Sequence, residues 1–242
     1  MQYWAITDPG CVRTENQDAY ITEELNGALL CAVCDGMGGA KSGNIASALT
    51  AEIFAQAVKG AWKPGMDQKT LDTLLLNAVK VTNFTVYDQA MSVEDFAGMG
   101  TTLAAMLMEH DRITVVNVGD SRVYRINAGG IRQVTKDHSL VQMMIDRGEL
   151  TPEQGKTYPG KNMITRAVGT EAAVQSDLFH LKPEWGETWL ICTDGLTNLM
   201  EDQEILFEIM YNEDRQACCR RLLDIAISRG APDNVTCILV QA

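Results

Sequence analysis

Positive charge is scarce in this sequence. Its 242 residues include 20 lysines and arginines against 32 aspartates and glutamates, so the formal net charge is −12. Nucleic acids are held mainly through lysine and arginine contacts with phosphate, and anionic membrane surfaces attract the same charges. The composition therefore argues against a nucleic-acid-binding protein and against binding to an anionic membrane.

Long apolar runs are also missing. The longest wholly apolar stretch is residues 28–34, far short of the ~20 residues that a membrane-spanning helix needs. Residues 1–5 contain no basic segment followed by an apolar one, so no secretory signal is expected. We therefore expect a cytoplasmic protein, and a monomer.

A disulfide framework is not indicated. The seven cysteines are odd in number and scattered. Cys31 and Cys34 form a C-x-x-C motif, which can indicate a metal or redox site. They lie in a strand-like run, however, where an offset of three directs side chains to opposite faces. We interpret them as thiols of the core, which fits a reducing compartment.

Strand and helix patterns alternate along the chain without a linker or repeat, which predicts a single domain over residues 1–242. An Asn26-Gly27 pair between two strand-like runs predicts a hairpin. Strands are expected at residues 3–7, 19–25, 28–34, 101–108, 113–118, 122–126, 131–135, 174–181, 188–193 and 234–240. Helices are expected at residues 42–62, 71–90, 139–147, 202–211 and 215–229.

This order of elements predicts an α+β fold. Two packed antiparallel sheets would form a central β-sandwich, flanked on both faces by pairs of helices. Residues 151–162 are polar and contain two prolines and two glycines, so we expect a mobile surface segment there.

Aspartates recur where predicted strands begin or end. Asp35 and Asp194 each follow an apolar strand and precede a glycine, and Asp120 lies between two strands. Asp18 leads into the second strand, and Asp233 precedes the last one. Carboxylates that converge at such positions repel one another unless a cation lies between them.

Oxygen ligands favour hard cations such as Mg²⁺, Mn²⁺ or Ca²⁺ over zinc. A glycine after an aspartate lets the backbone approach an ion closely. A lone Asp-Gly pair is usually only a turn, so the residues by themselves leave two interpretations open, a hard-metal site or a set of ordinary turns.

Seven ordered blocks resemble the metal-dependent protein phosphatase family, the PP2C-like or PPM enzymes, in their compact bacterial form. The resemblance spans nearly the whole chain and implies the same β-sandwich. The blocks are RTENQD at 13–18, DGMGG at 35–39, GTT at 100–102, VGDSR at 118–122, ITRAVG at 164–169, TDGL at 193–196 and PDNVT at 232–236.

The resemblance implies a protein serine/threonine phosphatase with two core Mn²⁺ or Mg²⁺ ions and a third ion. Asp35 would bridge the core ions, with Asp194 and Asp233 completing the first. The Gly36 carbonyl and, through water, Asp18 would bind the second.

Asp120 and Asp194 would hold the third ion, which the resemblance suggests for bacterial members. Arg13 would contact the phosphate, because a guanidinium matches phosphate geometry; the alternative is an ordinary surface arginine. The polar stretch at 139–162 would match the variable flap beside the active site.

One departure concerns the leaving-group acid. Many relatives carry a histidine near the Asp-Gly turn, where this sequence has Met37 and Ala40. His110, His138 and His180 are the only histidines, and we interpret them as turn, loop and strand residues. The sequence therefore does not identify the leaving-group acid, and a water bound to the third ion is the preferred candidate.

Two other functions compete with this one. A two-metal nuclease would share the cation chemistry but needs a basic track that this chain lacks. A pseudophosphatase would bind phosphoproteins without turnover, although every expected aspartate is present. The expected partners are phosphoproteins, as substrates of a bacterial Ser/Thr kinase.

Overall fold

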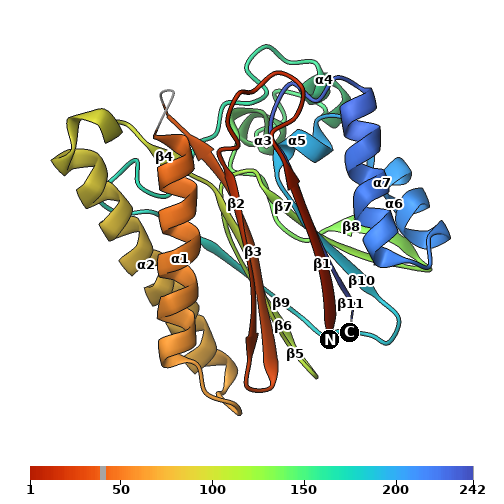
Figure 1. The fold of residues 1–242 in the computed structure, drawn as a ribbon, viewed down its shortest axis with the longest axis horizontal. Helices are drawn as coiled ribbons and strands as arrows, with labels where there is room; N and C mark the ends of the chain where they lie inside the picture. Colours follow the sequence, from red (N-terminus) through yellow and green to blue (C-terminus); the bar gives the residue numbers. More distant parts are fainter. Residues whose placement is uncertain (39–41, 242) are drawn as a thin grey trace.

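The computed structural model describes residues 1–38 and 42–241. Its strands form two antiparallel sheets that face each other (Figure 1). One sheet has the order β1-β11-β10-β7-β8 and the other the order β2-β3-β5-β6-β9, with β4 paired to β3 outside this path. The strands are β1 (Gln2–Asp8), β2 (Asp18–Leu25), β3 (Ala28–Met37), β4 (Gly100–Thr101), β5 (Leu103–Glu109), β6 (Ile113–Val118), β7 (Arg122–Asn127), β8 (Gly130–Gln133), β9 (Asp177–Leu181), β10 (Thr188–Cys192) and β11 (Val235–Gln241).

Helices cover the outer faces of both sheets. The pair α1 and α2 lies against the sheet that contains β2 and β3. The pair α6 and α7 lies against the other sheet, with α7 next to β1 and β11 and α6 next to β8 (Figure 1). The predicted α+β sandwich with flanking helix pairs is therefore confirmed. The helices are α1 (Gly43–Ala61), α2 (Gln68–Ser92), α3 (Leu140–Asp146), α4 (Pro152–Lys156), α5 (Asp194–Thr197), α6 (Asp202–Tyr211) and α7 (Arg215–Ser228), with a 3-10 turn at Glu94–Phe96.

Strand β3 contributes to two layers of the core. Leu30, Ala32 and Cys34 pack with the α1 and α2 helices, whereas Leu29 and Cys31 pack between the two sheets. The alternation follows from the two-residue period of a strand. A strand buried on both faces is apolar throughout, which is why residues 28–34 form the longest apolar run.

The cysteines behave as predicted. Cys31 and Cys34 are buried on opposite faces of β3, and all seven cysteines are free. Only Cys11 is exposed. Across the described residues, no helix is both long and apolar enough to cross a membrane.

Two short helices were not predicted. Helix α4 lies in the segment that we expected to be mobile and without a helix, and a capping box of Thr151 and Gln154 begins it. The T-x-x-Q pattern followed by proline at the first helical position is a signal for such a start. The predicted strand at 188–193 ends one residue early, and Asp194 begins helix α5 instead.

Candidate metal centre

A cavity of about 290 Å³ opens at the end of the sandwich where β3 ends. Six of the seven predicted site residues line it: Arg13, Asp35, Gly36, Asp120, Asp194 and Asp233. They come from five separate stretches of sequence, so the fold brings them together. Ala40, where the family histidine was considered, lies outside the described residues.

Asp18 lies next to this cavity rather than in its lining. It is the partner of Asp35 in the β2–β3 ladder. Its Oδ2 accepts hydrogen bonds from the Thr193 hydroxyl at 2.9 Å and the Thr236 hydroxyl at 2.6 Å. Its Oδ1 is buried without a hydrogen-bond partner, and such an atom calls for a water or an ion. Burial raises the pKa of Asp18 to about 7.

The backbone around Asp35 is fixed by neighbouring threonines. The Asp35 N–H donates to the Thr102 hydroxyl at 2.9 Å, and its carbonyl accepts from the Thr101 hydroxyl at 2.8 Å. Burial raises the pKa of Asp35 well above its ordinary value, and the charges of Asp18 and Asp194 raise it further. A cation would relieve this repulsion.

Gly36 is required by close backbone approach. A Cβ at this position would lie 2.0 Å from the carbonyl oxygen of Gly43. The Gly36 N–H also donates to the Gln17 carbonyl at 3.0 Å. The absence of a side chain therefore lets the turn after β3 pack tightly at the cavity wall.

Asp194 and Asp120 complete the acidic side of the cavity. Burial raises the pKa of Asp194, and the charge of Asp233 raises it further, against hydrogen bonds from Asp35 and Asn198. Burial raises the pKa of Asp120 to about 7, with added repulsion from Asp194. The raised values share one cause, which is negative charge gathered in poorly hydrated surroundings.

Asp233 is engaged by protein donors on both oxygens. Its Oδ2 accepts from Arg13 Nη2 at 2.9 Å, and its Oδ1 accepts from the Asn234 N–H at 3.0 Å. Within residues 1–38 and 42–241, no three acidic, histidine or cysteine side chains already form a ligand set for one ion.

The donor set nevertheless fits a hard divalent cation. It consists of carboxylates and a glycine carbonyl, which are the oxygen ligands that Mg²⁺ and Mn²⁺ prefer. The unpartnered Oδ1 of Asp18 and the raised pKa values of Asp35 and Asp120 indicate the same need for positive charge.

Sequence reasoning missed part of the lining. Thr102, Asn162 and Ile164 also face the cavity. Asn162 ends segment 139–162, which was expected beside the site without named contacts, and Ile164 begins the block at 164–169. Thr102 belongs to the GTT block, but its hydrogen bond to Asp35 depends on strand pairing over 67 residues.

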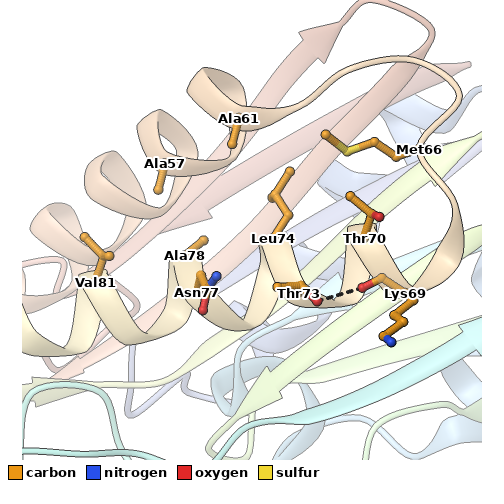
Figure 2. Close-up of a pocket in the computed structure, with 10 residues that line it drawn as sticks. All are labelled: Ala57, Ala61, Met66, Lys69, Thr70, Thr73, Leu74, Asn77, Ala78 and Val81. Carbon is orange, nitrogen blue, oxygen red and sulfur yellow. Dashed lines mark hydrogen bonds between the residues drawn. The ribbon is translucent and has the colours of Figure 1, made fainter.

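A larger hollow between α1 and α2 has the wrong chemistry for this role (Figure 2). Its volume is about 520 Å³, and Lys69 is the one charged residue among those that line it. Three alanines, Met66, Leu74 and Val81 are six of its ten lining residues (Figure 2). The acidic cavity is therefore the candidate site.

The chain is similar to known protein phosphatases in sequence and in fold. The family model described as "Protein phosphatase 2C" matches residues 12–221. The serine/threonine protein phosphatase PstP of Mycobacterium tuberculosis is 36% identical over 241 residues, which cover 100% of this chain and 45% of that protein. This chain therefore spans less than half the length of that relative.

Solved structures share the whole fold. Serine/threonine phosphatase Stp1 from Staphylococcus aureus superposes with a TM-score of 0.93 at 33% identity, over 100% of this chain and 95% of that chain. The catalytic domain of a PstP in complex with two manganese ions gives a TM-score of 0.84 at 33% identity, over 98% and 96% of the two chains.

Proposed function

Because this chain belongs to the protein phosphatase 2C family, we propose that it is a metal-dependent protein serine/threonine phosphatase. It hydrolyses phosphoserine and phosphothreonine in proteins. The observation that carries this proposal is the cavity where Asp35, Asp120, Asp194 and Asp233 converge with Arg13 at its rim.

Two Mn²⁺ or Mg²⁺ ions occupy this site in the proposed enzyme. Asp35 would serve both ions, Asp194 and Asp233 would complete the first, and the Gly36 carbonyl and Asp18 (through water) would hold the second. When bound, such ions lower the pKa of a water and neutralise phosphoryl oxygens as charge develops. The complex of the related PstP catalytic domain with two manganese ions supports the number and kind of these ions.

Asp120 and Asp194 hold a third ion in this proposal. The two carboxylates repel each other across the cavity, and this repulsion contributes to the raised pKa of Asp120. Asp120 lies in the turn between β6 and β7, whereas Asp35 lies near the end of β3 and Asp194 begins α5.

Arg13 binds the substrate phosphate. Its side chain is exposed at the rim of the cavity, and its pairing with Asp233 directs the guanidinium toward the carboxylates. A guanidinium presents several N–H donors in a planar fork that suits phosphate oxygens. The exposed pair with Asp233 is weak enough to exchange for that contact.

The partners in this proposal are phosphorylated proteins, the substrates of a bacterial Ser/Thr kinase. The enzyme acts as a monomer in the cytoplasm, and its seven unpaired cysteines are consistent with a reducing compartment. Segment 139–162, with Asn162 in the cavity lining, acts as the flap beside the bound phosphoprotein.

Turnover of a phosphothreonine peptide with and without Mn²⁺ tests the proposal. Release of phosphate that requires Mn²⁺ supports the enzyme. Peptide binding without phosphate release would instead indicate a pseudophosphatase. Incubation with single-stranded DNA under the same conditions tests the nuclease alternative, for which we expect no cleavage.

A further inference from the structure

His138 is a buried histidine that the proposed chemistry does not use. It precedes segment 139–162 and lies beside the β6–β7 turn that carries Asp120. Only 6% of its surface is exposed, and both ring nitrogens have polar neighbours. A buried polar side chain with this many contacts holds a specific geometry.

Two hydrogen bonds join His138 to Gly119, the residue before Asp120. The Gly119 N–H donates to Nδ1 of the ring at 3.1 Å. In return, the His138 N–H donates to the Gly119 carbonyl at 3.0 Å. Gly119 has a φ of +102°, and a Cβ there would lie 2.5 Å from Thr102 Cγ2. The turn is therefore held in a conformation that requires glycine.

The far side of the ring fixes its tautomer. Since Nδ1 accepts from Gly119, the proton of the neutral ring is on Nε2, which lies 3.1 Å from Asp177 Oδ2. Arg166 Nη1 donates to Asp177 Oδ1 at 2.9 Å and lies 3.1 Å from Nε2. Burial lowers the pKa of His138, which agrees with a neutral ring. Asp177 thus holds Nδ1 free to accept.

The backbone of His138 also closes the base of segment 139–162. Its carbonyl accepts from the Thr165 N–H at 2.7 Å, and the Leu140 N–H donates to the Met163 carbonyl at 2.8 Å. Between these bonds lies Ile164, which lines the cavity. One residue therefore contacts both the Asp120 turn and the start of the proposed flap.

On its other side the same turn is anchored to the Asp35 strand. The hydroxyls of Ser121 and Thr102 are 2.7 Å apart, and Thr102 also accepts from the Asp35 N–H. Asp120 is thus flanked by one hydrogen-bonded neighbour on each side. His138 supplies the contact that faces segment 139–162.

We propose that His138 is a positioning residue, which fixes Asp120 through the backbone of Gly119 and links this carboxylate to the base of the flap. The proposal rests on the proposed function, in which Asp120 helps to hold a cation. A support of this kind sets the direction of the ligand without touching the ion.

Two variants of similar size test the hydrogen bonds of the two ring nitrogens separately. In His138→Asn, the amide oxygen can replace Nδ1 and accept from Gly119, while contact with Asp177 is lost. In His138→Gln, the longer amide can reach Asp177, while the acceptor for Gly119 is lost. Thermal melting of both proteins reports whether each is folded.

The first readout is amide exchange of Gly119 in EDTA-treated protein. We expect about tenfold faster exchange in His138→Gln, because its hydrogen bond is gone, and near-normal exchange in His138→Asn. The second readout is calorimetric Mn²⁺ binding. In His138→Gln, the weakest Mn²⁺ site should bind about tenfold to a hundredfold less tightly than in wild type. In His138→Asn, its affinity should be unchanged. The phosphopeptide kcat of His138→Gln should fall with little change in KM.

Asp177→Ala tests the same link without altering the histidine. With the carboxylate gone, Arg166 donates to Nε2, so the proton moves to Nδ1 and opposes the Gly119 N–H. Nitrogen NMR of the ring should report this change of tautomer, and Gly119 exchange should quicken. This variant stays informative if substitution of His138 prevents folding.

The proposal is overturned if Gly119 exchanges equally in the Asn and Gln variants, or if Mn²⁺ affinity is unchanged when Gly119 is loosened. Asp120→Ala separates this failure from failure of the proposed function. If Asp120→Ala also retains every Mn²⁺ ion, the assignment of Asp120 as a ligand is wrong. If it loses one ion while both His138 variants lose none, the positioning role is wrong.

Discussion

Arg13 donates from Nη2 to Oδ2 of Asp233 at 2.9 Å, across a sequence separation of 220 residues. The contact joins the loop before β2 to the residues that lead into β11. Both side chains keep considerable exposure, 53% and 37%, so the pair adds at most about 1 kcal/mol to stability. Its importance lies in position, because Asp233 is a proposed cation ligand and Arg13 a proposed phosphate ligand.

Arg13→Ala should therefore separate substrate binding from cation binding. We expect KM for para-nitrophenyl phosphate to rise more than kcat falls, because the contact is equally strong in ground and transition states. Mn²⁺ affinity should be retained or increased, since Asp233 loses a competing partner. Steady-state kinetics and calorimetry measure the two effects.

The matched control for this prediction is Arg220→Ala, which removes an exposed arginine paired with Asp224 on α7. Its kinetics should equal those of the wild type. If Arg13→Ala behaves in the same way as this control, Arg13 is an ordinary surface arginine.

Mn²⁺ should stabilise the folded protein by mass action. Free Mn²⁺ at about 100 times its dissociation constant adds roughly 2.7 kcal/mol, which raises Tm by about 5–10 °C for a chain of this size. Differential scanning fluorimetry with Mn²⁺, and then with excess EDTA, measures the shift and its reversal. An unchanged Tm across millimolar Mn²⁺ would speak against the carboxylate site.

In EDTA, stability should fall as pH rises toward 8. The folded pKa values of Asp18 and Asp120 are both raised to about 7. An acid whose pKa is higher in the folded than in the unfolded protein contributes to the free energy of unfolding while it is protonated. This contribution is complete below the unfolded pKa, near 4, and is lost as pH rises through the folded pKa, about 7. Melting curves at pH 6 and 8 measure the decrease.

Asp120→Asn is the control for the pH prediction, because the amide does not titrate. Its Tm should fall less between pH 6 and 8 than that of the wild type. Saturating Mn²⁺ should also reduce the wild-type decrease. Identical decreases in both proteins would show that Asp120 does not contribute.

The sequence predicted most of the architecture because its signals were periodic. The long helices α1 and α2 and the two-residue alternation of β3 were recognisable without tertiary information. Helix α5 has four residues, too few to show a helical period, so the sequence pattern places Asp194 at the end of a strand. Helix α4 has a capping signal at Thr151, but the two prolines and two glycines of residues 151–162 indicate a loop.

The sequence identified most residues of the site, but it did not predict the contacts between them. The aspartates were identified at strand ends and by resemblance. The contact of Arg13 with Asp233 and that of His138 with Gly119 depend on tertiary packing. His138 lies 19 residues from Gly119, and only the β7–β8 hairpin brings the two together. No local pattern marks such a pair.

Asp120→Ala tests the proposed third cation. Asp120 lies outside the proposed ligands of the core pair, so two Mn²⁺ ions should still bind while one is lost. If that site provides the leaving-group proton, a phosphopeptide should lose much more kcat than para-nitrophenyl phosphate, whose phenolate leaves readily. Calorimetry counts the ions, and kinetics on both substrates gives the ratio.

Equal losses of kcat on the two substrates, with one ion gone, would assign that ion a different role.

Asp137→Asn is unsuitable as a control here, because Asp137 forms an ion pair with the half-buried Arg122. Asp88→Asn on the exposed face of α2 changes one acid without touching the cavity, and it should leave both kcat values unchanged.

The central claim is that Asp35 joins the cations of a Ser/Thr phosphatase. Its most direct test is Mn²⁺-dependent phosphate release from a phosphothreonine peptide by wild type, Asp35→Asn and Asp88→Asn, with folding checked by circular dichroism. We predict full activity in wild type and Asp88→Asn, and none detectable in folded Asp35→Asn. A loss smaller than tenfold in Asp35→Asn, about 1.4 kcal/mol of barrier, would contradict the account.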